Sequence, residues 1–332
     1  MKHILKKFWI VICLALIINI PILILGTVRT NQSIMLKGDT SNIDNVVTID
    51  SQYDTVGSFS SIFVLSVDKC TILQSLFAKI DKTATVEELN PYYGHFSDWE
   101  NYRMGQVQKN SSIMTSLITA YSYAQKENTS INIEYSFKSL CVSFYFDGTD
   151  FRIDDEIIKI NDIDVSVGYS QFSQAIRNSK SGDVVTVLRD NKEMQITLTN
   201  CAYNLCRYYP YYNINYDTIY PKANIKSSFV GGPSGGLLQT LAIYNQLVPF
   251  DYTKGLKITG TGTMSVDGSV GAIGGIKQKI YTAFDDDMDV FLCPADNYEE
   301  ALQAYNTIVY KEKMLLIKVS NFSEALQYLY YV

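Results

Sequence analysis

Residues Phe229–Gly236 read FVGGPSGG and place Ser234 between a proline and two glycines. Proline presets the backbone angle of a first helical turn, and glycine lets a substrate backbone approach closely. A helix that starts here would also offer free backbone N–H groups close to the serine hydroxyl. The stretch therefore predicts a strand–bend–helix unit in a mixed α/β domain, with Ser234 as a candidate nucleophile at the bend.

A serine nucleophile needs a neighbouring base to take its proton. Only two histidines occur in the 332 residues, so an amine is the natural candidate. The stretch Gly274–Lys279, read GGIKQK, offers Lys277 and Lys279 at the start of a further helix. The apolar positions 276, 280 and 283 would desolvate a neighbouring lysine and lower its pKa. The helical wheel does not decide between the two lysines, because each flanks that apolar face at a similar angle.

Composition excludes several classes of function. The net charge is −6 and no basic stripe is present, which argues against nucleic acid as a partner. No clustered His, Cys or acidic spacing suggests a metal, so we expect neither a metal nor another cofactor. The phosphate-loop pattern G-x-x-x-x-G-K-S/T does not occur, which predicts no ATPase activity within this sequence.

The N-terminal segment predicts a membrane anchor. Lysines at positions 2, 6 and 7 precede Phe8–Val28, a run without a charged residue that is long enough for the roughly 30 Å of a bilayer core. The alternative, a cleaved signal peptide, would have a shorter apolar region and a small-residue cleavage site. We expect residues 1–30 to form a cytoplasmic tail and one transmembrane helix, with the rest of the chain outside the cell membrane.

Residues 31–131 form an expected β/helical region outside the membrane. The segment Asn45–Leu76 alternates enough to predict strands, and Trp99–Lys126 predicts a helix. An apolar stripe at spacings of three and four follows that helix, and core packing explains it: Met114, Leu117, Ala120, Tyr121 and Ala124.

Residues 132–200 predict a compact module of short strands with one helix near 171–179. The runs Asp155–Asp162 and Ser181–Arg189 resemble those of a PDZ domain, a class that binds an extended peptide as an added strand. Two departures stand out. Asp154 occupies the place of a usual glycine, and Ser139–Val142 lacks the glycine of the carboxylate-binding loop.

The remaining residues, 201–332, alternate strands and helices as in an α/β catalytic domain. The tyrosines clustered between Tyr203 and Tyr220 indicate either a half-buried strand or an exposed contact surface. Cys201 and Cys206 are spaced for a disulfide in an oxidising compartment, or are small buried residues.

The segment Gly231–Lys279 resembles the proteolytic domain of Lon proteases, whose serine lies in a Gly-Pro-Ser-Ala-Gly motif and whose lysine is the second in a Gly-Gly-Leu-Lys-Glu-Lys motif. The resemblance implies Ser234 as nucleophile and Lys279 as base, leaving Lys277 as a neighbour. The run 260–275 matches the family's strand–turn segment, which implies that Thr261 orients the lysine.

The same resemblance implies supporting roles around the serine for Gly232, Pro233 and Gly235. Gly235 replaces the usual alanine, which should loosen the bend slightly. Gly231 stands where many Lon enzymes carry aspartate, so no acidic group would support the pair there.

Taken together, the anchor, the PDZ-like module and the Lon-type domain resemble the membrane-anchored, PDZ-containing Lon-like serine proteases of Gram-positive bacteria. That resemblance implies an ATP-independent serine endopeptidase that cleaves flexible peptides or protein segments outside the membrane. Lon-type domains often assemble as rings, so a homo-oligomer is possible. The alternatives are an inactive PDZ scaffold that only binds peptides, and an assembly protein with the tyrosine-rich segment as its contact surface.

Overall fold

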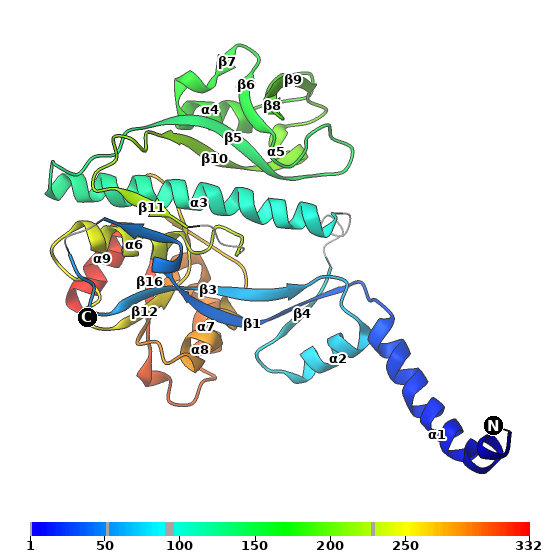
Figure 1. Cartoon of the computed structure of the whole chain (residues 1–332). Coiled ribbons are helices and arrows are strands. Elements are labelled where there is room, and N and C mark those ends of the chain that lie inside the picture. Colours follow the sequence, from blue (N-terminus) through cyan, green and yellow to red (C-terminus); the bar gives the residue numbers. More distant parts are fainter. Residues whose placement is uncertain (1, 51–52, 90–95, 227–229) are drawn as a thin grey trace. The chain divides into compact units, whose positions relative to one another are not determined.

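The computed structural model describes residues 2–50, 53–89, 96–226 and 230–332, with the side chains of residues 2–7 and 10 left out. Within it the chain divides into two units, which we describe separately (Figure 1). The first comprises Met1–Gly38 and Val64–His95, and the second Asp39–Phe63 and Phe96–Val332. Strands β1 (Gln32–Asn42) and β3 (Ser58–Val67) contribute residues to both units.

The first unit contains α1 (Lys2–Thr27), α2 (Ile72–Ile80) and β4 (Thr85–Glu88), which pairs antiparallel with β1. Helix α2 starts at a capping box in which Thr71 and Gln74 bond each other's backbone N–H groups. A small core holds the unit together: Ile34, Cys70, Ala78 and Ala84. The strand prediction for Asn45–Leu76 is wrong from Ile72 onward, because this capping box starts a helix there.

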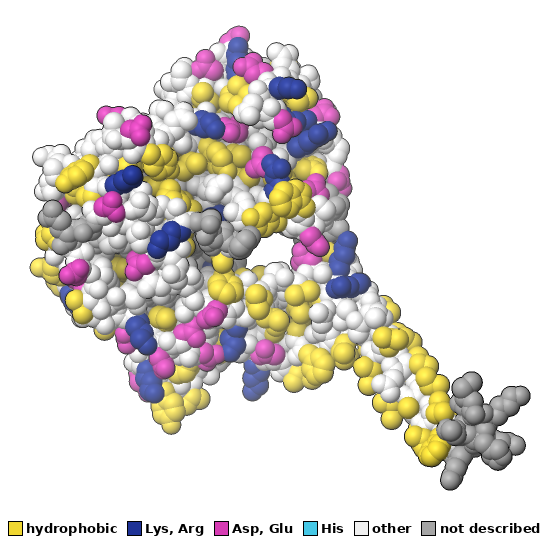
Figure 2. Space-filling view, in the orientation of Figure 1, with side chains coloured by type: hydrophobic (Ala, Val, Ile, Leu, Met, Phe, Trp, Pro, Cys, Tyr) yellow, Lys and Arg dark blue, Asp and Glu magenta, His cyan; other side chains and the backbone are white. Residues whose placement is uncertain are grey.

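Exposed apolar side chains follow α1 along its described length, among them Trp9, Leu14, Ile17 and Leu23 (Figure 2). No helix within the described residues combines the length and the apolarity that crossing a bilayer requires. The transmembrane anchor expected at Phe8–Val28 therefore stays a prediction.

The second unit is built on parallel strands in the order β16-β15-β12-β3. All residues of β15 are buried, as a parallel strand covered on both faces requires. This confirms the mixed α/β prediction. Its further elements are β12 (Lys257–Gly260), β15 (Val290–Pro294), β16 (Leu315–Val319), α6 (Gly236–Leu247), α7 (Ile276–Asp285), α8 (Tyr298–Tyr305) and α9 (Phe322–Tyr331), with the short pairs β2 (Val47–Ile49)–β11 (Ala223–Ile225) and β13 (Thr263–Met264)–β14 (Val270–Gly271).

Helix α3 (Asp98–Glu127) is the long helix of this unit, and it confirms the prediction for Trp99–Lys126. It begins at a capping box between Ser97 and Glu100. Its predicted apolar stripe is buried at Leu117, Tyr121 and Ala124 in the core that α6 shares.

A second sheet, which we call the sheet module (residues 135–214), has the strand order β10-β5-β6-β8-β9. Strand β5 is paired along both edges, with β10 on one side and β6 on the other. The elements are β5 (Tyr135–Tyr145), β6 (Glu156–Ile160), β7 (Ile163–Asp164), α4 (Tyr169–Arg177), β8 (Val184–Arg189), β9 (Lys192–Thr197), α5 (Ala202–Leu205) and β10 (Cys206–Ile214).

Strand β10 brings the tyrosine-rich segment into the sheet module. Most of its side chains are half-buried, so the strand alternative is the one observed. This strand belongs to the sheet module because it pairs with β5 from Tyr145 to Tyr135. The module therefore extends beyond residue 200, where we expected it to end. Cys201 and Cys206 are free thiols, the second of them buried.

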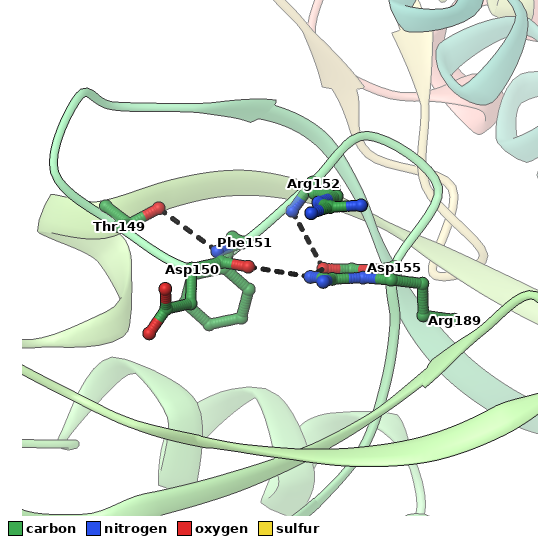
Figure 3. Close-up of polar contacts among 6 residues, drawn as sticks. All are labelled: Thr149, Asp150, Phe151, Arg152, Asp155 and Arg189. Atoms are coloured by element: carbon green, nitrogen blue, oxygen red, sulfur yellow. Dashed lines mark hydrogen bonds and ion pairs between the residues drawn. The ribbon is translucent and has the colours of Figure 1, made fainter.

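A buried ion pair fixes the loop before β6 (Figure 3). Arg189 donates from Nε and one terminal nitrogen to the two carboxylate oxygens of Asp155, each at 2.7 Å, and to the Asp150 carbonyl at 2.6 Å. Asp155 also accepts from the Arg152 backbone N–H at 2.8 Å. Its neighbour Asp154 has a φ of 72°, the left-handed backbone that glycine adopts at no cost. A short polar residue such as aspartate also tolerates this backbone, which most side chains avoid.

Candidate active site

Ser234 lies in a tight turn immediately before α6. The N–H of Gly236 donates to the Pro233 carbonyl at 3.2 Å and closes that turn. The Ser234 carbonyl accepts from the Gly262 N–H at 2.8 Å, which ties the turn to the segment after β12. Of the stretch quoted first, Phe229 lies outside the described residues.

Lys279 reaches the turn from the first part of α7. Gly275 precedes this helix with a φ of 72°, a backbone that favours glycine. The helix then buries Ile276, Ile280 and Ala283 in a core with β15, and this draws Lys279 inward. Only 2% of Lys279 is exposed, whereas Lys277 is half-buried.

The amine and two hydroxyls come together at this point. Lys279 Nζ lies 2.8 Å from Ser234 Oγ and 2.9 Å from Thr261 Oγ1. Thr261 is itself buried and donates to the Ser234 carbonyl at 3.0 Å. Of the two lysines between which the helical wheel did not decide, Lys279 is the one in contact with Ser234. Thr261 bonds to both of these residues.

Burial sets the protonation of this amine. Desolvation lowers the pKa of Lys279 from its ordinary value to about 7. An exposed lysine is almost wholly charged at neutral pH, whereas at this pKa roughly half of the amines are neutral. A neutral amine 2.8 Å from a serine hydroxyl can accept its proton.

The absence of a side chain at position 231, where no acidic group supports the serine–lysine pair, has a steric cause. A Cβ on Gly231 would lie 2.9 Å from the Cα of Gly105 in α3, and such a contact forces the backbone apart. Aspartate at this position would therefore displace either α3 or the turn. No group of three or more His, Cys, Asp or Glu that could hold a metal occurs among the described residues.

The polar residues beneath the turn were not predicted from the sequence. Ser112 and Ser116 of α3 and Gln239 of α6 are buried there and hydrogen bond to one another or to the turn's backbone. The signal was a run of hydroxyl residues at helical spacing from Ser111 to Thr119, on a helix where we followed only the apolar stripe.

Residues 223–331 match the family model of the Lon protease (S16) C-terminal proteolytic domain. A Lon protease of Campylobacter jejuni is 33% identical over 97 residues, which are 29% of this chain and 12% of that relative. The chain thus spans a small part of the length of that relative. The matched residues are similar to the serine peptidase domain of Lon proteases, and Ser234, Thr261 and Lys279 all lie within them.

Proposed function

We propose that this chain is an ATP-independent serine endopeptidase in which Ser234 and Lys279 act as a catalytic dyad. The observation that supports it best is the 2.8 Å contact between the Ser234 hydroxyl and the buried Lys279 amine. The Lon-type peptidase match over residues 223–331 supports the same reaction class.

In the first step the Ser234 Oγ attacks the scissile carbonyl, and Lys279 Nζ takes the serine proton. The tetrahedral intermediate collapses to an acyl-enzyme, and Lys279 returns the proton to the leaving amine. Water then attacks the ester with Lys279 as base. The bond between the acyl carbon and Ser234 Oγ breaks, and Lys279 returns the proton to Oγ as the acid product leaves. Thr261 holds the amine toward the serine throughout, since it contacts both residues.

The oxyanion of the intermediate needs backbone donors close to Ser234. The Gly232 N–H is bonded to the Gly105 carbonyl at 2.9 Å, and the Gly236 N–H is bonded within the turn. The N–H groups of Ser234 and Gly235 are therefore our candidates.

Flexible peptides and unfolded segments are the proposed substrates. The sequence contains no phosphate-loop motif with which to drive unfolding by ATP hydrolysis. We also propose that α1 attaches the chain to the cell membrane with its N-terminus in the cytoplasm and the peptidase outside. The exposed apolar side chains of α1 support this, because water disfavours such a surface. For the sheet module, the PDZ-like fold remains our proposal; the pairing of both β5 edges disfavours peptide addition at that strand.

The test compares cleavage of an unstructured peptide by the wild type, Ser234→Ala and Lys279→Met, without ATP. We expect both variants to lose essentially all activity, and Lys277→Met, the matched control, to keep it. A fluorophosphonate probe should label the wild type at Ser234. Full cleavage by Ser234→Ala or Lys279→Met would refute the dyad.

A further inference from the structure

Helix α3 lies between the sheet module and the turn that carries Ser234 (Figure 1). Two consecutive residues of this helix bond in opposite directions. Ser111 Oγ donates to the Pro210 carbonyl of β10 at 2.7 Å, and Ser112 Oγ donates to the Pro233 carbonyl of the turn at 3.3 Å. Pro233, the residue directly before Ser234, is therefore linked to β10 of the sheet module through two adjacent residues of α3, Ser112 and Ser111.

The turn meets α3 at a second point, where two glycines touch. The Gly232 N–H donates to the Gly105 carbonyl at 2.9 Å. A Cβ added at Gly105 would lie 3.3 Å from the Gly231 Cα, and one added at Gly231 would lie closer still. The approach of helix and turn thus depends on the absence of side chains on both.

A buried polar cluster supports the other end of the turn. Ser116 Oγ donates to the Gly236 carbonyl at 3.1 Å. Ser112 and Ser116 each lie 3.4 Å from Gln239 Oε1, and all three residues are buried. Since these contacts flank Ser234 in sequence on both sides, α3 constrains the entry and the exit of the nucleophile turn.

The opposite side of α3 is attached to the sheet module at several levels. Arg103 forms an ion pair with Asp154, which precedes β6. Tyr145 of β5 donates to Glu100 at 3.1 Å, and the Tyr211 hydroxyl of β10 lies 3.4 Å from the Val107 carbonyl. A shift of the sheet module relative to α3 would act on the helix along much of its first half.

We propose that α3 positions the Ser234 turn and couples it to the sheet module, with Gly105 and Ser112 as positioning residues and Ser111 as the link to β10. This inference rests on the proposed function. A catalytic group works only when held within about half an ångström of its productive place, so a small displacement of α3 changes the rate. Neither serine touches a reacting atom, and their effect passes through the Pro233 and Pro210 carbonyls.

The experiment is a double-mutant cycle on the full chain with Ser111→Ala, Ser112→Ala and the double variant. We expect each single change to lower kcat about 2- to 10-fold with little change in KM, as the loss of one hydrogen bond would do. The double variant should lose about as much as the more affected single variant, because both changes break one linkage. The control is Thr115→Val, whose hydroxyl bonds, among the described residues, to the Ser111 and Ser112 carbonyls of its own helix.

Thermal unfolding of all variants is measured alongside, and kcat should fall in variants whose Tm stays within a few degrees of the wild type. An active wild type whose Ser111→Ala variant keeps full kcat, or whose single losses simply multiply in the double variant, overturns the coupling and leaves the proposed function standing. A wild type that neither cleaves peptide nor labels at Ser234 overturns both.

Discussion

Lys279 is a residue that the fold accommodates at a cost. Its long side chain is almost wholly buried, and it bonds two neutral hydroxyls rather than a carboxylate. A charge in such a place loses its hydration without gaining an opposite charge in return. The arrangement is therefore understandable for catalysis and unfavourable for stability, and the two properties should respond oppositely to substitution.

Lys279→Met should accordingly stabilise the protein. The folded chain releases the lysine proton near pH 7, whereas the unfolded chain keeps it to about pH 10. Because the unfolded state binds more protons between these values, the stability of the wild type rises with pH across that window. We expect the variant to gain about 1–4 kcal/mol at pH 7 and the gain to shrink toward pH 10.

Urea unfolding at pH 7 and pH 9.5 measures both effects, with Lys277→Met as the control that should show neither. Equal stability of Lys279→Met and the wild type at pH 7 would mean that the amine is not desolvated as described.

Gly235 offers a contrasting prediction. Its backbone, with φ −86° and ψ −2°, is open to alanine, and the added Cβ would lie 3.3 Å from Gln239 Nε2, the amide nitrogen of a side chain whose Oε1 faces Ser112 and Ser116. Gly235→Ala should raise the free energy of unfolding by about 0.4–1 kcal/mol, because alanine restricts the unfolded chain more than glycine does. The variant should keep kcat within about twofold of the wild type. Gly231→Ala is the matched comparison, since its Cβ would meet the Gly105 backbone, and it should lower kcat. Loss of most cleavage by Gly235→Ala would contradict this account of the turn.

At the scale of single residues, the sequence indicated Ser234, Thr261 and Lys279, which meet at the turn, but not the buried polar residues beneath it. Apolar spacing around Lys277 and Lys279 could not separate the two, because burial depends on how α7 packs against β15. The resemblance to Lon proteases indicated Lys279, and the structure brings that residue to Ser234. Gln239 and Ser112 were not found, because their meeting depends on the packing of α3 against α6.

Among the elements, the ion pair between Asp155 and Arg189 makes the sheet module sensitive to one substitution. Asp155 is 1% exposed, so removing its partner leaves a buried charge without compensation. Arg189→Leu should destabilise the protein by about 3–5 kcal/mol. Arg152→Ala is the control, since Arg152 contacts Asp155 through its backbone N–H and its side chain is exposed.

Hydrogen exchange of the β6 and β8 amides, with urea unfolding, checks this effect. Unchanged protection in Arg189→Leu would show that the pair contributes little to the module.

Elements were predictable where we followed their apolar spacing, and they were missed where that spacing was not used or where distant strand pairing defines the element. Helix α3 was predicted from the apolar stripe between Met114 and Ala124, and this stripe faces the core. Helix α2 carries apolar residues at helical spacing (Ile72, Leu76 and Ile80), a signal that the strand prediction for this segment did not use, and the capping box at Thr71 starts the helix. Strand β10 joins the sheet module by pairing with β5 across a long stretch of chain, which alternation alone does not specify.

For the whole molecule, membrane attachment is the open proposal, and α1 is where it can be tested. We expect the wild type to sediment with membranes and to resist alkaline carbonate extraction. Leu16→Arg with Ile17→Arg should shift it to the soluble fraction, because each arginine disfavours insertion by about 2.5–3.5 kcal/mol. The control is Val309→Arg with Tyr310→Arg, two exposed apolar positions of the second unit. A wild type recovered in the soluble fraction would refute the anchor.

The central claim is that a buried, neutral Lys279 activates Ser234, and the most direct measurement is the rate of fluorophosphonate labelling of Ser234 as a function of pH. We expect a labelling rate that rises with pH, with a midpoint near the Lys279 pKa of about 7, and that levels off above it. In Lys279→Met the labelling should be slow at every pH. A wild-type rate that is flat from about pH 6 to 9, or a Lys279→Met variant that labels as fast as the wild type, would contradict the claim.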